Sequence, residues 1–242
     1  MSQPLTPEQL AELRRFSTPT VCNAIEMFDV RRRTDGFMRP GLECRFPELG
    51  VIVGYAATAT SRAARPAGNG GGVELRAYYE HIVAQPAPRI LVAQDLDDPP
   101  LGALFGEVNA SVHQALGCVG HITNGGVRDL DECRHIGFQF FSSCVQASHA
   151  YVHLESFGHP VEVGGIAVHP GDLIHADRHG VCLIPHEVAP EVAAACEAME
   201  AIERPLTELA RSPEATPQAL AAGFGALRAG FAAASVRFRH RP

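Results

Sequence analysis

The sequence predicts an α/β fold with mixed sheets and a helical C-terminus, and three observations lead to this class. Between residues 51 and 142, short apolar β-rich segments alternate with helical ones, which is typical of βαβ units around a largely parallel core. Between residues 160 and 184, strand-like segments are separated by glycine-containing turns and indicate an antiparallel part. From Glu187 onward, the alanine-rich sequence favours helix.

Each element follows from local signals. Thr6 is the expected N-cap of a helix that starts at Pro7, and Thr18-Pro19-Thr20 is expected to start a second helix that runs to Glu26. Gly164-Gly165 has the length and composition of a two-residue hairpin turn. The predicted strands are 51–60, 89–94, 119–123, 138–142, 160–163, 166–168, 172–176 and 181–184, and the predicted helices between them are 73–84, 106–116 and 129–135.

The chain shows no internal repeat and no linker, so we expect a single domain over residues 1–242. Residues 1–16 should hold an N-terminal helix and residues 187–242 a C-terminal helical extension. We expect no leader peptide and no apolar run of membrane-spanning length, which predicts a cytoplasmic protein without a membrane partner. The net charge of −7 argues against nucleic acid as a partner, and Arg31-Arg32-Arg33 is interpreted as a solvated turn.

All twenty basic residues are arginine, because the chain contains no lysine. Schiff-base aldolases, pyridoxal-phosphate enzymes and lysine-bearing phosphate loops are therefore excluded. Seven widely spaced cysteines without a C-x-x-C pair indicate buried thiols rather than disulfides or a zinc ribbon. The run 67–72 fits neither nucleotide-binding glycine motif, so we expect a mobile loop and no bound nucleotide.

The residues suited to chemistry lie in 102–109 and 124–129, each at the end of a predicted strand where a helix begins. The N–H groups of Gly106, Glu107, Val108 and Asn109 would form a carboxylate site at the helix start. Arg128 offers a planar fork for a carboxylate or enolate oxygen, and Asp129 is a hard oxygen ligand suited to Mg²⁺ or Mn²⁺. The simpler alternative is a capping aspartate beside a surface arginine.

The wider spacing resembles that of a known family. Glu107 is followed by twenty residues and then by Arg128-Asp129, with Glu132 three positions beyond Asp129. This pattern resembles the D-x20-R-D-x2-[ED] signature of the RraA-like family, which includes 4-hydroxy-4-methyl-2-oxoglutarate aldolases. Ser17–Val21, Val163–Asp172 and Gly180–Pro185 extend the resemblance, which runs from about residue 14 to residue 205.

The resemblance implies a swivelling-domain-like α/β/β/α sandwich, assembled as a homotrimer or a hexamer. It implies a divalent-metal-dependent (class II-type) lyase that forms a pyruvate enolate, by aldol cleavage of a 4-hydroxy-2-oxo acid or by decarboxylation of oxaloacetate. The N–H groups of Gly106 to Asn109 would hold the substrate carboxylate and Arg128 would stabilise the enolate oxygen. Asp129 would anchor Mg²⁺ or Mn²⁺, and Glu107 would orient the water that donates or accepts a proton.

Some positions depart from the family pattern. Glu107 stands where Asp is more usual, Asn124 where many members carry Asp, and Gly126 where others have a bulkier residue. Glu132 is a candidate outer ligand. Glu203, or Glu200, could be the acid that family aldolases borrow from a neighbouring subunit.

Three alternatives stay open. Some relatives bind a ribonuclease instead of catalysing, although these tend to have glycine at the position of Glu107. A methyltransferase would need a nucleotide loop that the sequence lacks. His149 and His153 have the spacing of a helical metal pair, but a loop with solvated histidines is the preferred interpretation.

Overall fold

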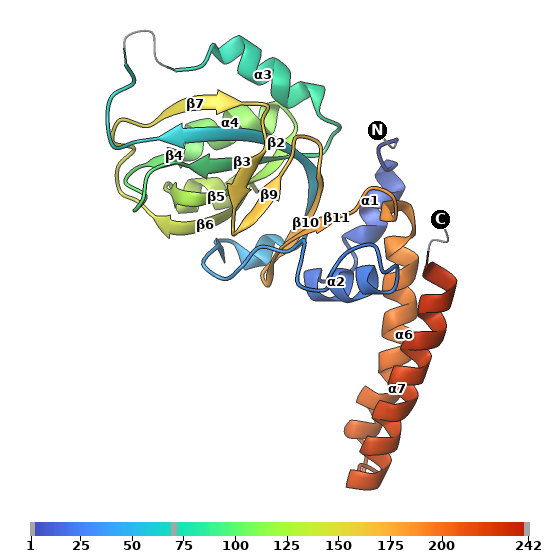
Figure 1. The fold of residues 1–242 in the computed structure, drawn as a ribbon. Helices are drawn as coiled ribbons and strands as arrows, with labels where there is room; N and C mark the ends of the chain where they lie inside the picture. Colours follow the sequence, from blue (N-terminus) through green and yellow to red (C-terminus); the bar gives the residue numbers. More distant parts are fainter. Residues whose placement is uncertain (1–2, 69–71, 240–242) are drawn as a thin grey trace. The chain divides into compact units, whose positions relative to one another are not determined.

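A nine-stranded mixed sheet forms the centre of residues Gly36–Ile184 in the computed structural model (Figure 1). The structure describes residues 3–68 and 72–239, and it divides into two compact units. One unit is Gly36–Ile184, and the other combines Met1–Asp35 with Pro185–Pro242. The segment expected to be a mobile loop, 67–72, lies partly outside the described residues.

Parallel strands make up the middle of the sheet, as the alternating pattern predicts. β2, β3, β5 and β6 are neighbours in that order and all run parallel, while β10 and β1 pair antiparallel at either side of this group. The strands are β1 (Glu43–Cys44), β2 (Ile52–Arg62), β3 (Arg89–Asp95), β4 (Ala103–Phe105), β5 (Cys118–Val127), β6 (Gln139–Val145), β7 (His153–Phe157), β10 (Leu173–Asp177) and β11 (Gly180–Ile184). The sequence did not predict β1, β4 or β7.

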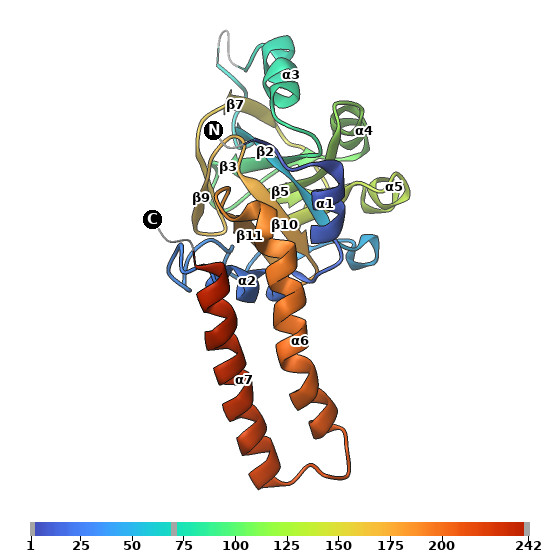
Figure 2. The same ribbon diagram turned by 90° about the vertical axis from the view of Figure 1, so that its right-hand side faces the viewer.

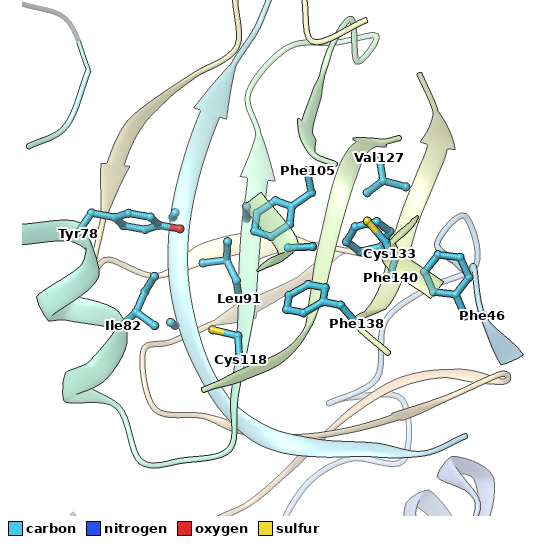
Figure 3. Close-up of a cluster of buried hydrophobic side chains, with 14 residues drawn as sticks. Phe46, Tyr78, Ile82, Leu91, Phe105, Cys118, Val127, Cys133, Phe138 and Phe140 are labelled. Atoms are coloured by element: carbon cyan, nitrogen blue, oxygen red, sulfur yellow. The ribbon is translucent and has the colours of Figure 1, made fainter. Parts of the chain in front are cut away.

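Alternate residues of the central strands enter two different hydrophobic clusters. Leu91 and Ala93 belong to the cluster that also includes residues of α3 (Leu75–Ala84), α4 (Glu107–Ala115) and α5 (Leu130–His135), shown in Figure 3. Ile90 and Val92 belong to the other, with the hairpin β8 (Val161–Val163) and β9 (Ile166–Val168). Both faces of the sheet are therefore covered, which explains why its strands are continuously apolar.

The hairpin turn and the antiparallel pair form as predicted. Gly164 and Gly165 have φ values of 59° and 73°, the positive pair that a two-residue hairpin turn requires. β10 pairs antiparallel with β11 from Leu173↔Ile184 to Asp177↔Gly180. A short 3₁₀ helix, η1 (Pro47–Leu49), lies between β1 and β2.

The second unit is helical, as expected for both ends of the chain. Thr6 forms a capping box with Gln9 at the start of α1. The N-cap of the next helix is Ser17 and not Thr18, because the Ser17 hydroxyl accepts the N–H of Thr20 and Thr18 is already helical. The elements are α1 (Pro7–Leu13), α2 (Thr18–Glu26), η2 (Ala189–Glu191), α6 (Val192–Ala210) and α7 (Pro217–Phe238). α6 and α7 lie side by side in both views (Figures 1 and 2).

α7 corrects one expectation. By length and composition it is the one helix among the described residues that could cross a membrane, with a mean hydropathy of 1.4 over an 18-residue window that is 6% buried. The sequence expectation that no apolar run reaches this length was wrong. Half of the residues of α7 are alanine or glycine, so its large apolar side chains are widely spaced. Figure 2 shows α7 running antiparallel to α6.

Two buried histidines pack against Phe105, which belongs to the cluster shown in Figure 3. The His121 ring stacks on Phe105 at 4.0 Å between centroids, and the His113 ring lies 4.7 Å from it. Burial lowers the pKa of His113 to about 4, opposed in part by its hydrogen bond with Asn109 O. Burial and the neighbouring His113 lower the pKa of His121 to about 3. Both imidazoles are therefore neutral in the folded protein at neutral pH.

These depressed pKa values predict acid sensitivity. Below pH 6.5 the unfolded chain protonates both histidines, whereas the folded protein does not until about pH 4 and pH 3. The free energy of unfolding should therefore fall between pH 6.5 and 4, by on the order of 3 kcal/mol for each histidine at about 1.4 kcal/mol per pH unit. Urea titrations at several pH values should give a shallower fall for His121→Leu. His135→Gln, at an exposed histidine, should match the wild type, and an equally steep fall in His121→Leu would contradict the assignment.

Candidate active site

Two strand ends meet where the sequence placed its candidate residues. β4 pairs parallel with β5, with Ala103 opposite Gly126 and Phe105 opposite Val127. The N–H of Arg128 donates to Phe105 O at 2.9 Å. Each strand leads directly into a helix, β4 into α4 and β5 into α5, so both helix starts lie at the same edge. Gly106, Glu107, Arg128 and Asp129, separated by about twenty residues in sequence, are therefore neighbours.

Asp129 joins the two helix starts. Its Oδ2 accepts the N–H of Glu107, the first residue of α4, at 3.0 Å. Asp129 itself has φ 53° and ψ 49°, the left-handed conformation that Asp tolerates better than most residues. A Cβ on Gly106 would lie 2.2 Å from this oxygen, so only glycine permits the approach.

Arg128 lies beside this carboxylate and is accessible. Its Nε is 3.8 Å from Asp129 Oδ2, and both side chains are 36% exposed. The guanidinium thus forms an ion pair with a carboxylate, at a distance too long for a hydrogen bond, and its N–H groups can reach a bound anion. The arginine is not locked inside the hydrophobic interior.

The start of α4 presents backbone donors at the same place. The first intrahelical hydrogen bond runs from Ala110 N–H to Gly106 O, so the N–H groups of Val108 and Asn109 precede the helical ladder. The Asn109 side chain instead donates to Leu104 O at 2.6 Å. Asn109 therefore offers a ligand its backbone N–H and not its amide. The N–H of Glu107, which the sequence also assigned to the carboxylate site, already donates to Asp129.

Three carboxylates make this corner negative. Burial, then the charges of Asp129, Glu132 and Glu107, raise the pKa of the buried Cys133 thiol to about 12. Within the described ranges, no three His, Cys, Asp or Glu side chains converge to enclose a metal ion. The donor set fits Mg²⁺ or Mn²⁺ held by one or two carboxylates and several waters, and does not form an all-protein cage.

Among the described residues, the other predicted side chains take no part in the hydrogen bonds and the ion pair given above. Glu132 is exposed in the first turn of α5. Glu203 and Glu200 belong to α6, in the other compact unit. His153 begins strand β7 and its Nε2 contacts Glu155 at 3.2 Å, so the helical spacing considered for His149 and His153 does not form.

The sequence did not single out two cavities at the carboxyl ends of the central strands. One, of about 440 Å³, is lined in part by Asp95, Asn124 and Ser143. The other, of about 480 Å³, is lined in part by Arg62 and Glu155. The acids at the end of β3 and directly after it, Asp95, Asp97 and Asp98, are the sequence feature that could have indicated these cavities. Ligands of α/β sheets bind at such strand ends.

Two unusual residues of the motif have structural explanations. Asn124 exchanges hydrogen bonds with the backbone of Asp95, accepting its N–H and donating to its carbonyl, both at 2.8 Å. A Cβ on Gly126 would lie 2.2 Å from Cγ of Gln146. Gly126 is therefore needed because Gln146 fills the space that a bulkier residue would take.

Comparison with known proteins places the chain in a family. Residues 18–183 match the family model described as RraA-like, Aldolase/RraA. A Halalkalibacterium halodurans protein that carries the provisional name 4-hydroxy-4-methyl-2-oxoglutarate aldolase is 29% identical over 112 residues, which are 46% of this chain and 51% of that protein. The chain thus spans about half the length of this curated relative.

Solved structures share the fold. A Pseudomonas syringae protein has a TM-score of 0.69 at 22% identity, covering 92% of this chain and 99% of its own. Streptomyces coelicolor RraAS2, described as an unusual member of the RNase ES inhibitor RraA family, has a TM-score of 0.65 at 22% identity, covering 84% and 96%. These matches confirm the expected fold class, a mixed α/β fold with a helical C-terminus.

The contact at Gly106 gives a direct test. Gly106→Ala should displace the Asp129 carboxylate, because the new Cβ occupies its position, and should destabilise the protein by about 1–3 kcal/mol. Urea unfolding and the amide chemical shift of Glu107 would report both effects. Gly225→Ala, in α7 with open space around its Cβ, is the control and should be neutral or slightly stabilising. An unshifted Glu107 amide in Gly106→Ala would refute the contact.

Proposed function

Because the chain belongs to the RraA-like family, we propose that it is a divalent-metal-dependent lyase that forms a pyruvate enolate. Its substrate would be a 4-hydroxy-2-oxo acid, cleaved as in an aldolase, or oxaloacetate, decarboxylated. The observation that supports this most is the meeting of the Arg128 guanidinium, the Asp129 carboxylate and the start of α4 at one strand edge.

Binding of the 2-oxo acid would use two of these groups. The N–H groups of Val108 and Asn109 face the helix start and suit the substrate carboxylate. Arg128, held by Asp129, would donate to the keto oxygen, where negative charge develops as the carbon–carbon bond breaks. Donors fixed before reaction lower the barrier because they need no reorganisation.

The metal would lie on the Asp129 side of the site, with Glu107 and Glu132 adding to the negative potential. When bound, Mg²⁺ or Mn²⁺ supplies Lewis-acid polarisation of the keto oxygen. Without any lysine, the chain has no Schiff-base route to the same stabilisation, so the guanidinium and the cation would replace it.

Glu107 would act as the general base and general acid of the reaction. Its side chain is exposed at the first position of α4, next to the carboxylate site. In aldol cleavage it would take the proton of the 4-hydroxyl group, directly or through a water, as the bond between C3 and C4 breaks. The same group would return a proton to C3 of the enolate and release pyruvate.

The alternative proposal is a non-catalytic regulator that binds a ribonuclease or another protein. The family includes both aldolase-type enzymes and ribonuclease inhibitors, and RraAS2 is described as an unusual member of an RNase ES inhibitor family. The acidic Glu107 favours catalysis, because relatives that act as regulators tend to have glycine at this position. A tight nuclease complex without any metal-dependent turnover would reverse this preference.

Activity measurements test the lyase directly. Metal-stripped protein should release no pyruvate from oxaloacetate or a 4-hydroxy-2-oxo acid until Mg²⁺ or Mn²⁺ is restored. Arg128→Ala should then lower kcat/KM by on the order of a hundredfold or more, since it removes charge stabilisation from the transition state. Arg134→Ala is the matched control, because that arginine contacts Glu48 and Asp131 on the surface. Equal kcat/KM values for Arg128→Ala and wild type would contradict the proposal.

We also propose that a second copy of the chain covers α7, within a cytoplasmic homotrimer or hexamer that binds neither nucleic acid nor membrane. Phe224 and Val236 of α7 are 53% and 71% exposed. A helix of 22 residues is about 33 Å long, a large apolar surface for a monomer. α7 carries arginines and no acids, whereas exposed glutamates lie along α6, so two copies would offer complementary charge.

Phe224→Glu should therefore reduce the molar mass measured by light scattering, because it puts a charge into the proposed interface. Leu75→Glu makes the same change at a similarly exposed residue of α3, 56% against 53%, and should leave the mass unchanged. A monomeric wild type that instead binds lipid vesicles through α7 would show that a membrane is the partner.

A further inference from the structure

A buried chain of hydrogen bonds connects α3 with the strand that leads into the candidate site. The Tyr78 hydroxyl lies 2.8 Å from His113 Nε2, and His113 Nδ1 lies 2.7 Å from Asn109 O. The Asn109 amide then donates to Leu104 O at 2.6 Å. Tyr78 and His113 are 2% and 3% exposed, so water does not compete for these bonds.

The donors in this series of hydrogen bonds have one possible direction. The Asn109 carbonyl can only accept, so His113 Nδ1 must carry the proton. His113 is neutral, and its Nε2 is then an acceptor for the Tyr78 hydroxyl. The donors therefore point in sequence from Tyr78 to His113, from His113 to Asn109, and from Asn109 to Leu104. Removing the first donor leaves a buried nitrogen without its partner, which is costly.

The hydrogen-bonded chain ends at Leu104, the residue before Phe105. The Phe105 ring stacks on His121, at 4.0 Å, and on Phe138, at 5.9 Å. Figure 3 shows Tyr78 extending from α3 into the same cluster as Phe105 and Phe138. The carbonyl of Phe105 accepts the N–H of Arg128, and Phe105 precedes Gly106. The backbone from 104 to 106 is thus held by buried side chains and by the Arg128 N–H.

We propose that Tyr78, His113 and the side-chain amide of Asn109 are positioning groups that set where the start of α4 presents its N–H groups to a substrate carboxylate. This inference rests on the proposed function, which places the carboxylate there. Tyr78 and His113 act only through other residues, because Tyr78 fixes His113 and His113 fixes Asn109. The Asn109 amide fixes Leu104, whereas the backbone N–H of Asn109 belongs to the carboxylate site itself. A network that aligns a carboxylate site serves substrate and transition state alike, so its loss should raise KM more than it lowers kcat.

Tyr79 supplies a matched control one residue along the same helix. Its ring contacts His113 edge-on at 6.4 Å, yet it is Tyr78 whose hydroxyl takes part in the hydrogen-bonded chain. Tyr78→Phe and Tyr79→Phe each remove one hydroxyl from α3. A difference between them reports the chain of hydrogen bonds and not the loss of a hydroxyl in general.

The experiment measures pyruvate release, thermal unfolding and amide hydrogen exchange of residues 107–109. Tyr78→Phe should raise KM three- to tenfold with kcat changed less than twofold, and should speed exchange at the α4 start. Tyr79→Phe should match the wild type. The double variant Tyr78→Phe/His113→Leu, which removes both buried partners, should recover thermal stability but keep the raised KM.

A merely structural role gives a different pattern. In that case KM would return to the wild-type value together with stability in the double variant, or would not change in Tyr78→Phe at all, and either result overturns the inference. If the wild type itself releases no pyruvate, the proposed lyase function fails, and the exchange rates decide the positioning role alone. Equal exchange at residues 107–109 in Tyr78→Phe and Tyr79→Phe would then refute it.

Discussion

The hydrogen bond from the Glu107 N–H to the Asp129 carboxylate is the constraint on which the site depends. It ties the start of α4 to the start of α5 and requires glycine at position 106 and a left-handed backbone at Asp129. Strained backbone of this kind persists only where its surroundings hold it, and it is common at functional sites. The same oxygen lies 3.8 Å from Arg128 Nε, so one carboxylate binds the helix N-terminus and also forms an ion pair with the guanidinium.

The core behind the site is built to keep this geometry rigid. Phe105 lies between aromatic neighbours, and two neutral buried histidines replace the apolar side chains that a sheet core would ordinarily hold. His113 is satisfied on both nitrogens, whereas His121 Nε2 has no partner among the described residues. An unpaired buried nitrogen lowers stability, so we interpret His121 as kept for its flat ring against Phe105.

Composition and geometry together restrict the chemistry. A chain without lysine has no side-chain amine to form an imine, and a corner with three carboxylates and one arginine is suited to a cation and an anionic oxygen side by side. The carboxylates do not enclose an ion within the described part of the chain. Waters would complete the coordination of a bound cation.

The sequence by itself determined the α/β class and the helix starts near Gly106 and Asp129, because these follow from local periodicity. It could not determine the short strand β4 or the exposure of α7, since neither has a strong local pattern. Only the tertiary structure decided that Asp129 caps α4 and that Tyr78 reaches His113. Such contacts join residues 22 and 35 positions apart, and side-chain packing, which no local pattern encodes, brings them together.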